Sequence, residues 1–132
     1  MPLQYLHYDL GVRHAAAGLT PSPEIVKVDP GPILEQWVGI ELWKRLQYLG
    51  QGSLYHQRTK DGAEIDFIVE REGTLIPIEV KWTENPTSQD ARHLITFLKE
   101  KPQESQQGYV ICRCSRPLKL HEQVTALPWF CL

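Results

Sequence analysis

The sequence predicts an α/β fold in which a mixed β-sheet is flanked by helices. Two helical patterns and a run of strand-like segments support this prediction. A long helical pattern at residues 33–50 precedes three consecutive strand-like segments, and a second helical pattern separates these strands from a fourth. Helices that alternate with strands in this order cover the faces of a sheet. We therefore expect a layered α/β structure.

The composition indicates one domain, residues 1–132, without a membrane segment. A chain of 132 residues can bury a core without disulfides. The sequence contains no apolar run of 18 residues and no signal-peptide pattern, so we expect a cytoplasmic protein with no membrane contact. The cysteines lack a zinc-ligand pattern and are expected to be free thiols. The net charge of −2 means that a nucleic-acid partner would need a local basic patch.

Two helices are predicted before the first strand. Residues 7–18 form a short helical pattern between an Asp9 cap and a Gly18 stop. In residues 33–50 apolar side chains recur every three or four positions, and Gly50 ends the pattern. At about 100° per residue, two glutamates fall within or beside this apolar stripe, Glu35 and Glu41. Glu41 has an alternative role in an ion pair with Arg45, one turn further on.

Three strands are predicted in succession, at residues 53–59, 63–70 and 74–82. The dipeptides Asp61-Gly62 and Glu72-Gly73 between them favour tight turns. These signals together predict a meander of three antiparallel strands.

A further helix is predicted to begin at Thr87 or Ser88 and to end before Pro102. Residues 108–114 read as a strand. The composition of residues 120–132 is too mixed to predict more than a short strand or helix there.

Charged residues interrupt the second and third strands. Side chains alternate between the two faces of a strand, so one face of the second strand would carry Ile65, Phe67 and Val69 and the other Glu64, Asp66 and Ile68. If Glu72-Gly73 is a two-residue turn, Arg71 faces Thr74 and the register continues from there. Asp66 is then opposite Glu79, and Glu64 is opposite Lys81. This register brings two carboxylates and a lysine onto one face.

Two carboxylates opposed across a strand pair lie about 5 Å apart and repel by about 3 kcal/mol at an effective dielectric near 20. A raised pKa or a nearby cation could offset this repulsion, and a divalent metal ion would turn it into coordination. A site with only a few carboxylate ligands, which leaves coordination positions open to water, suits Mg²⁺ or Mn²⁺. We therefore expect metal-assisted phosphodiester hydrolysis, in which Asp66 and Glu79 hold the metal and Lys81 orients water or stabilises developing charge.

A structural alternative stays open for the same residues. The second strand could lie at a sheet edge with its acidic face in solvent, and Lys81 would then only pair with Glu64.

His56 and His93 have no partner at ligand spacing, and the four tryptophans are expected to pack in the core or in interfaces rather than to stack on bases.

The residues Ile65-Asp66, Glu79-Val80-Lys81 and Glu35 resemble the PD-(D/E)XK nuclease superfamily. The core of that superfamily has a helix with an acid, a hairpin carrying Asp and then Glu-x-Lys, a helix and another strand. Ile65 stands where the proline of the motif would be, which leaves the acid in place. The resemblance implies a restriction-endonuclease-like core.

A second likeness covers nearly the whole chain, through YDLGVR, GPILEQWVGIEL, YHQRTKDGAEIDFIV, IPIEVKW, GYVIC and LPW. These stretches are similar to the uncharacterised C-terminal domain of bacterial and archaeal AAA-type ATPases. The sequence has no phosphate-binding G-x-x-x-x-G-K-[ST] loop, so no ATP site is expected. We expect the C-terminal part of a longer ATPase or a stand-alone copy, with DNA and an ATPase domain of the same or another chain as partners.

Residue by residue, the resemblance implies metal ligands at Asp66 and Glu79, with the Val80 backbone carbonyl as a further ligand. It implies that Glu35 is a ligand or a water-orienting acid and that Lys81 is the catalytic lysine. Gln89 would brace the site. The sequence thus predicts a nuclease that uses Mg²⁺ or Mn²⁺ to hydrolyse DNA; the alternative is an inactive nuclease-like fold that binds nucleic acid or regulates the ATPase.

Overall fold

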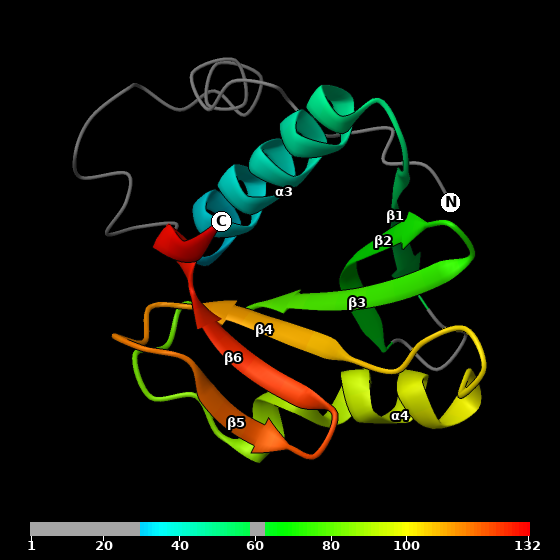
Figure 1. The fold of residues 1–132 in the computed structure, drawn as a ribbon. Helices are drawn as coiled ribbons and strands as arrows, with labels where there is room; N and C mark the ends of the chain where they lie inside the picture. The colour runs from blue at the N-terminus through cyan, green and yellow to red at the C-terminus, as the bar shows by residue number, and fades with distance from the viewer. Residues whose placement is uncertain (1–29, 59–62) are drawn as a thin grey trace.

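A computed structural model describes residues 30–58 and 63–132. Figure 1 shows a six-stranded mixed sheet with helix α3 (Pro30–Leu49) on one side and helix α4 (Arg92–Glu100) on the other. The predicted class, a mixed sheet flanked by helices, is confirmed. The helix predicted at 7–18 and the turn at Asp61-Gly62 lie outside the described residues. Within the described ranges, neither helix is long and apolar enough to cross a membrane.

Helix α3 follows the predicted apolar periodicity. It starts at Pro30, a residue that suits the first helical position because its fixed φ is helical and an N–H there would lack a partner. Leu34, Val38 and Leu46, which recur on one face, are buried against the sheet. Gly50 follows the last helical residue with a φ of 68°. This left-handed glycine ends the helix at the predicted position.

Strands β2 (Glu64–Arg71) and β3 (Thr74–Val80) form the hairpin that the sequence predicts. Arg71 pairs with Thr74 across a two-residue turn in which Glu72 and Gly73 have φ values of 51° and 80°. Positive φ at both turn residues is the conformation whose twist matches that of the strands. The Glu70 carboxylate accepts a hydrogen bond from the Gly73 amide at 3.1 Å. The register predicted for the hairpin is therefore confirmed from the turn to the pair of Phe67 with Ile78, where the backbone pairing ends.

Strand β1 (Ser53–Arg58) pairs with β2 on the side away from β3, so β2 is not at the edge of the sheet. The edge position considered as an alternative for the second strand is therefore wrong. Two residue pairs flank an irregularity in this ladder, Tyr55 with Ile68 and Gln57 with Ile65. Between them β1 has one residue, His56, whereas β2 has two, Asp66 and Phe67. Strand β2 thus carries a β-bulge at Asp66.

The bulge changes which face Ile65 occupies. Ile65 packs with Ile68 on the α4 side, whereas Phe67 and Val69 pack on the α3 side. Strict alternation would have put Ile65 with Phe67, so the predicted face of Ile65 is wrong. The extra residue of the bulge shifts the alternation by one position.

The rest of the sheet is built from a parallel crossover and a second hairpin. Helix α4 connects β3 to β4 (Gly108–Cys112), which lies parallel to β3, and β6 (Val124–Pro128) lies parallel to β4. Strand β5 (Leu118–His121) pairs antiparallel with β6 at the far edge. Residues 120–132, which had no firm prediction, thus supply most of this hairpin and a short 3-10 turn, η2 (Trp129–Cys131).

Helix α4 begins close to the predicted position. A 3-10 turn, η1 (Ser88–Ala91), precedes it, and the Thr87 amide donates a hydrogen bond to the Asp90 carboxylate at 2.9 Å. The helix ends at Glu100, two residues before Pro102. The polar residue at the start and the proline after the end are the signals from which it was predicted.

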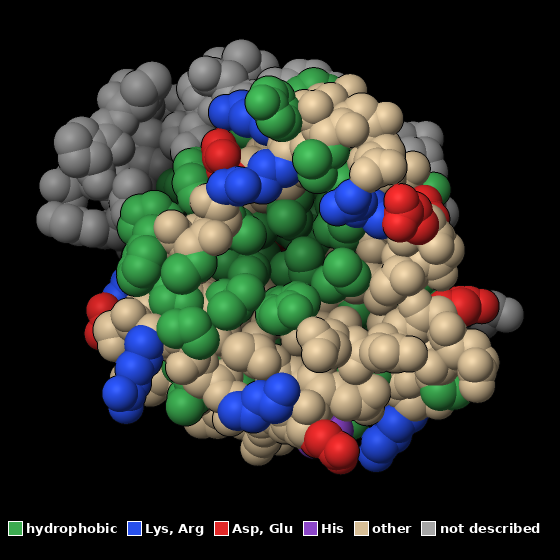
Figure 2. Space-filling view, in the orientation of Figure 1, with side chains coloured by type: hydrophobic (Ala, Val, Ile, Leu, Met, Phe, Trp, Pro, Cys, Tyr) green, Lys and Arg blue, Asp and Glu red, His purple; other side chains and the backbone are tan. Residues whose placement is uncertain are grey.

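Each face of the sheet has its own hydrophobic core. The cluster on the α4 side is completely covered at its centre, where Leu94 and Val110 are 0% exposed. Helix α3 covers less of the other face, and Figure 2 shows a hollow lined by hydrophobic side chains there. This groove has a volume of about 280 Å³, and Leu42, Ile76 and Leu127 contribute to its lining. The two helices therefore protect the sheet unequally.

Candidate functional site

Asp66 lies where the ladder between β2 and β3 stops. The last backbone pair is Phe67 with Ile78, so Asp66 and Glu79 are the next residues outward in the predicted register. The Lys81 amide donates to the Ile111 carbonyl on β4, and neighbouring amides of a strand point to opposite sides. The Val80 amide therefore points toward β2, where the Asp66 carboxylate accepts its hydrogen bond at 2.7 Å. A side-chain acceptor thus replaces the next backbone hydrogen bond of the ladder.

Glu79 is a buried acid whose carboxylate lies between Lys81 and the imidazole of His93. Its side chain is 4% exposed. Oε2 lies 3.4 Å from Nζ of Lys81, and Oε1 lies 3.5 Å from Nδ1 of His93 on α4. Oε1 is buried and has no hydrogen-bond partner among the described residues. One oxygen of this carboxylate is therefore only weakly satisfied by the protein.

Burial and like charges together raise the pKa of both central acids. Burial is the main reason that the pKa of Glu79 rises from its ordinary value of 4.5 to about 7, and the charges of Asp66 and Glu35 raise it further, against the opposing effect of Lys81. Burial also raises the pKa of Asp66, although the Val80 hydrogen bond and the Lys81 charge act in the opposite direction. An acid with a pKa near 7 is available both as a proton carrier and as a cation ligand.

The four charged residues predicted from the sequence are electrostatic neighbours in the structure. Asp66, Lys81 and Glu35 each influence the pKa of Glu79. Glu35 comes from the second turn of α3, β2 supplies Asp66, and β3 supplies Glu79, with Lys81 directly after its last residue. We name this group the acidic site: Glu35, Asp66, Glu79 and Lys81.

Other residues named from the sequence have different partners. Glu64 pairs with Arg58 across β1 and β2, so its predicted ion pair with Lys81 is wrong. Glu41 pairs with Lys44 at 3.3 Å rather than with Arg45, because positions three apart also face each other on a helix. Gln89 is exposed in η1. No contact between Gln89 and the acidic site appears in the described part of the chain.

Two histidines that had no assigned role lie beside the acidic site. Nδ1 of His93 approaches Glu79, and Nδ1 of His56 lies 3.1 Å from the backbone carbonyl oxygen of Asp66. Neither contact follows from residue spacing, because β1 and α4 meet the acidic site only through the tertiary fold. The sequence offered one signal for the contact of His93 with Glu79, which is that His93 lies in the helix that follows the Glu-x-Lys strand.

The acidic site has the chemical type of a Mg²⁺ or Mn²⁺ site without being a complete cage. No three His, Cys, Asp or Glu side chains within residues 30–58 and 63–132 form a group that could hold a metal ion. Magnesium is commonly held by one or two carboxylates, with its other positions left to water and phosphate. Asp66 and Glu79 could supply these carboxylates, and Glu79 Oε1 is a buried acceptor without a donor. The residues present therefore fit such an ion in type.

The comparisons with known proteins identify a family. Residues 30–132 match the sequence model of a family described as Domain of unknown function (DUF4143). No curated protein matches the chain. The family match covers most of the chain, including every residue of the acidic site, so the chain belongs to the DUF4143 family.

Proposed function

We propose that this member of the DUF4143 family is a metal-dependent nuclease domain that hydrolyses DNA phosphodiester bonds. The observation that carries the proposal is the pair of acids at the open end of the β2–β3 ladder, of which Glu79 is buried and Asp66 is half-buried. A buried carboxylate pair is costly unless a cation or a proton offsets its charge. Lys81 offsets part of this charge at Glu79, and a divalent cation would offset the rest.

The order of elements supports a restriction-endonuclease-like core. A helix with an acid, α3, precedes a hairpin that carries Asp66 and then Glu79-Val80-Lys81, and helix α4 with strand β4 follows. This order is the one that the resemblance to PD-(D/E)XK nucleases implies. The parallel pairing of β3 with β4 requires a crossover connection, and α4 in that connection brings His93 to Glu79.

Asp66, Glu79 and the Val80 carbonyl would hold Mg²⁺ or Mn²⁺, with Glu35 as a further ligand or water-orienting acid. In a strand the carbonyl of a residue points to the same side as its amide, so the Val80 carbonyl faces Asp66. When bound, such an ion lowers the pKa of a coordinated water and polarises a phosphoryl oxygen. Lys81, 39% exposed, can reach from Glu79 toward solvent to stabilise charge on a phosphate. His93 contacts Glu79 and would hold its carboxylate in position.

A second candidate function is a nuclease-like fold without chemistry, which binds nucleic acid or regulates an attached ATPase domain. The contacts within the acidic site favour it. Asp66 already accepts the Val80 amide, and Glu79 already contacts Lys81 and His93, so these residues could serve only to fasten the end of the ladder. In that case Asp66→Asn and Glu79→Gln would leave the function of the whole protein intact, whereas a change on the binding surface would abolish it.

A cleavage assay separates the two candidates. End-labelled single- and double-stranded DNA is incubated with the full chain and Mn²⁺ or Mg²⁺, and the products are resolved on a gel. Asp66→Asn and Lys81→Met should lose cleavage. Glu122→Gln is the matched control, because Glu122 is exposed in the β5–β6 turn, at the other end of the parallel strands. Wild-type protein that cuts neither DNA, or cleavage that persists in both site variants, would contradict the nuclease proposal.

A further inference from the structure

Three tryptophans converge on a pocket whose lining includes the sequence neighbours of two residues of the acidic site, Glu35 and Lys81. The pocket has a volume of about 230 Å³. It lies between the start of α3, the segment after β3, the residue after β4 and η2. We name it the aromatic pocket, and its lining residues are Ile33, Leu34, Trp37, Trp82, Arg113 and Trp129.

The rings are held in fixed orientations but are not sealed from solvent. Trp37 and Trp129 meet edge to face, with ring centroids 5.4 Å apart at an angle of 87°. The Arg113 guanidinium lies 4.1 Å from the centre of the Trp82 ring and pairs with the Glu84 carboxylate. Trp82 is 36% exposed and Trp129 is 41% exposed. Each ring therefore keeps part of its area in contact with solvent, where a planar ligand could reach it.

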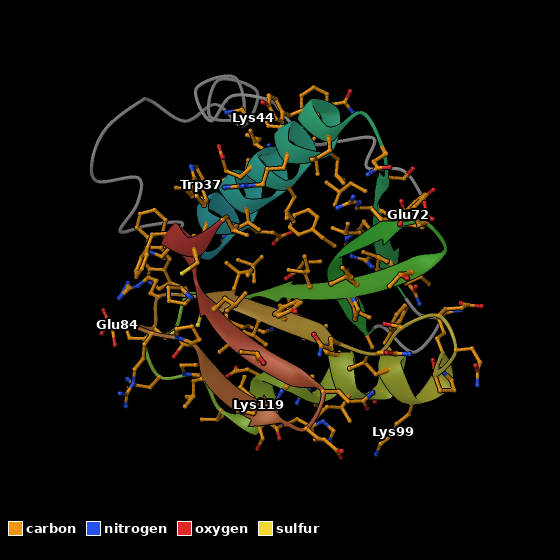
Figure 3. The ribbon with its side chains drawn as sticks, in the orientation of Figure 1. Trp37, Lys44, Glu72, Glu84, Lys99 and Lys119 are labelled. Atoms are coloured by element: carbon orange, nitrogen blue, oxygen red, sulfur yellow. The ribbon has the colours of Figure 1, made fainter. Side chains whose placement is uncertain are left out.

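The aromatic pocket is adjacent to the acidic site along two segments of the chain. Trp82 directly follows Lys81 after β3, and Ile33 and Leu34 directly precede Glu35 in α3. Figure 3 shows Trp37 and Glu84 at the same end of the molecule, far from Glu72 in the hairpin turn. A ligand that spans both features would therefore carry an apolar, planar part at the tryptophans and an anionic part near Lys81.

An unpaired nucleobase with its phosphate has this combination of properties. Bases stack on tryptophan rings and on arginine planes, and such stacking does not depend on base identity. The Arg113 guanidinium lies over the Trp82 ring, and Lys81, which is 39% exposed, directly precedes Trp82 in the sequence, so a stacked nucleotide would have positive charge near its phosphate. Bases inside a duplex have both faces occupied by their neighbours, so only a single-stranded or splayed-out base could enter.

We infer that the aromatic pocket stacks an unpaired base of single-stranded DNA, so that the adjacent phosphate lies at the acidic site. The inference rests on the proposed nuclease function and specifies its substrate class. An apolar protein segment is the competing occupant. It would use the rings but would have no need of the cations, which is why the observations favour a nucleotide.

Binding is measured by fluorescence anisotropy of a labelled oligothymidylate with the full chain in EDTA, so that cleavage cannot occur. Trp82→Ala should weaken binding by about tenfold or more, and Trp82→Phe should restore most of it, because a phenyl ring still stacks. Tyr48→Ala is the matched control, since Tyr48 is a 92% exposed aromatic residue at the other end of α3. Circular dichroism of each variant verifies that the fold is retained. If Trp82→Ala unfolds, the Trp82→Phe and Arg113→Gln variants carry the comparison.

The outcomes distinguish this inference from the proposed function. Equal binding of duplex and single strand, or binding that is unchanged in Trp82→Ala and Arg113→Gln, would overturn the inference even if DNA is cleaved. An apolar dye that binds at the tryptophans and is not displaced by oligothymidylate would also overturn it and would assign the pocket to a protein segment. Pocket-dependent binding of oligothymidylate without any Mn²⁺-dependent cleavage would support the inference and refute only the nuclease proposal.

Discussion

The β2–β3 hairpin has two ends that differ in almost every physical respect. At the turn end, Glu72 and Gly73 are exposed, the ladder is regular, and the Glu70 carboxylate accepts the Gly73 amide. At the open end the ladder stops two residues before the end of β3, β2 carries a bulge at Asp66, and Glu79 is buried with its pKa raised to about 7. The turn end is built for local stability. The open end holds charge where an ordinary strand would hold apolar side chains.

This difference indicates where the molecule accepts an energetic cost. Burying a carboxylate that is only partly paired destabilises a fold, whereas a two-residue turn with positive φ stabilises it. Changes at the open end should therefore alter activity strongly and can even stabilise the protein. Changes at the turn end should alter stability and leave activity unchanged.

The largest expected effect comes from separating the charge of Asp66 from its hydrogen bond. Asp66→Asn keeps an oxygen that can accept the Val80 amide, so stability should stay within about 1 kcal/mol of wild type, while cleavage falls by at least about 100-fold. Asp66→Ala should lose cleavage and also stability, because the Val80 amide is left without its acceptor. The expected loss of stability is about 1–3 kcal/mol. Urea unfolding and the cleavage assay measure the two quantities. Equal stability of the two variants would contradict a structural role for this hydrogen bond.

The next effect concerns the pH dependence of stability at Glu79. Its pKa is higher in the folded state, about 7, than the ordinary 4.5, so the folded state binds more protons between these values. The stability that the preferential protonation of folded Glu79 contributes is therefore fully present below pH 4.5. It is lost as the pH rises through 7, by up to about 3 kcal/mol. Glu79→Gln should remove this loss, so its stability relative to wild type should increase from pH 5 to pH 8. Urea unfolding across that range measures it, with Glu122→Gln expected to follow the wild-type profile.

At the turn end, Gly73→Ala should destabilise the protein by about 1–2 kcal/mol. Gly73 has a φ of 80°, which is unfavourable for any residue with a Cβ. An added Cβ would meet no atom within 4 Å, so the cost would come from the backbone alone. Cleavage should be unchanged at temperatures where the variant is folded. A loss of cleavage by the folded variant would show that the two ends are coupled.

The smallest expected effect is a gain in stability from Glu72→Asn. Glu72 has a φ of 51°, a conformation that asparagine adopts more readily, and Asn-Gly is the preferred pair for this turn. We expect an increase of roughly 0.5 kcal/mol, measured as a higher unfolding midpoint in urea with an unchanged slope. An unchanged or lower midpoint would mean that the Glu72 side chain contributes more to the folded state than its turn conformation costs.

The sequence was sufficient wherever the structure is set by neighbouring residues. The apolar repeat of α3 and the glycine after it predict that helix, and Glu72-Gly73 predicts the hairpin and its register. The predicted register also brings Asp66 and Glu79 to adjacent positions at the open end. Local periodicity and turn chemistry therefore account for most of the fold.

Residues whose environment is set by distant strands could not be predicted in this way. The bulge at Asp66 depends on how β2 pairs with β1, so the face of Ile65 was wrong. The contact of His93 with Glu79 depends on how α4 packs on the sheet. The strand β5 is short and mostly exposed at a sheet edge, so its composition carries little strand signal. The three tryptophans of the aromatic pocket and Arg113 come from four separate segments of the chain, and no spacing rule connects them.

The central claim is that the acids at the open end bind a divalent cation. Isothermal titration of Mn²⁺ into the full chain at pH 8, where Glu79 is mostly ionised, tests it most directly. We expect wild-type protein and Glu122→Gln to bind Mn²⁺ with equal affinity, and the Asp66→Asn, Glu79→Gln double variant to lose this binding. The claim would be contradicted if the wild-type protein did not bind Mn²⁺, or if the double variant bound it as tightly as wild type does.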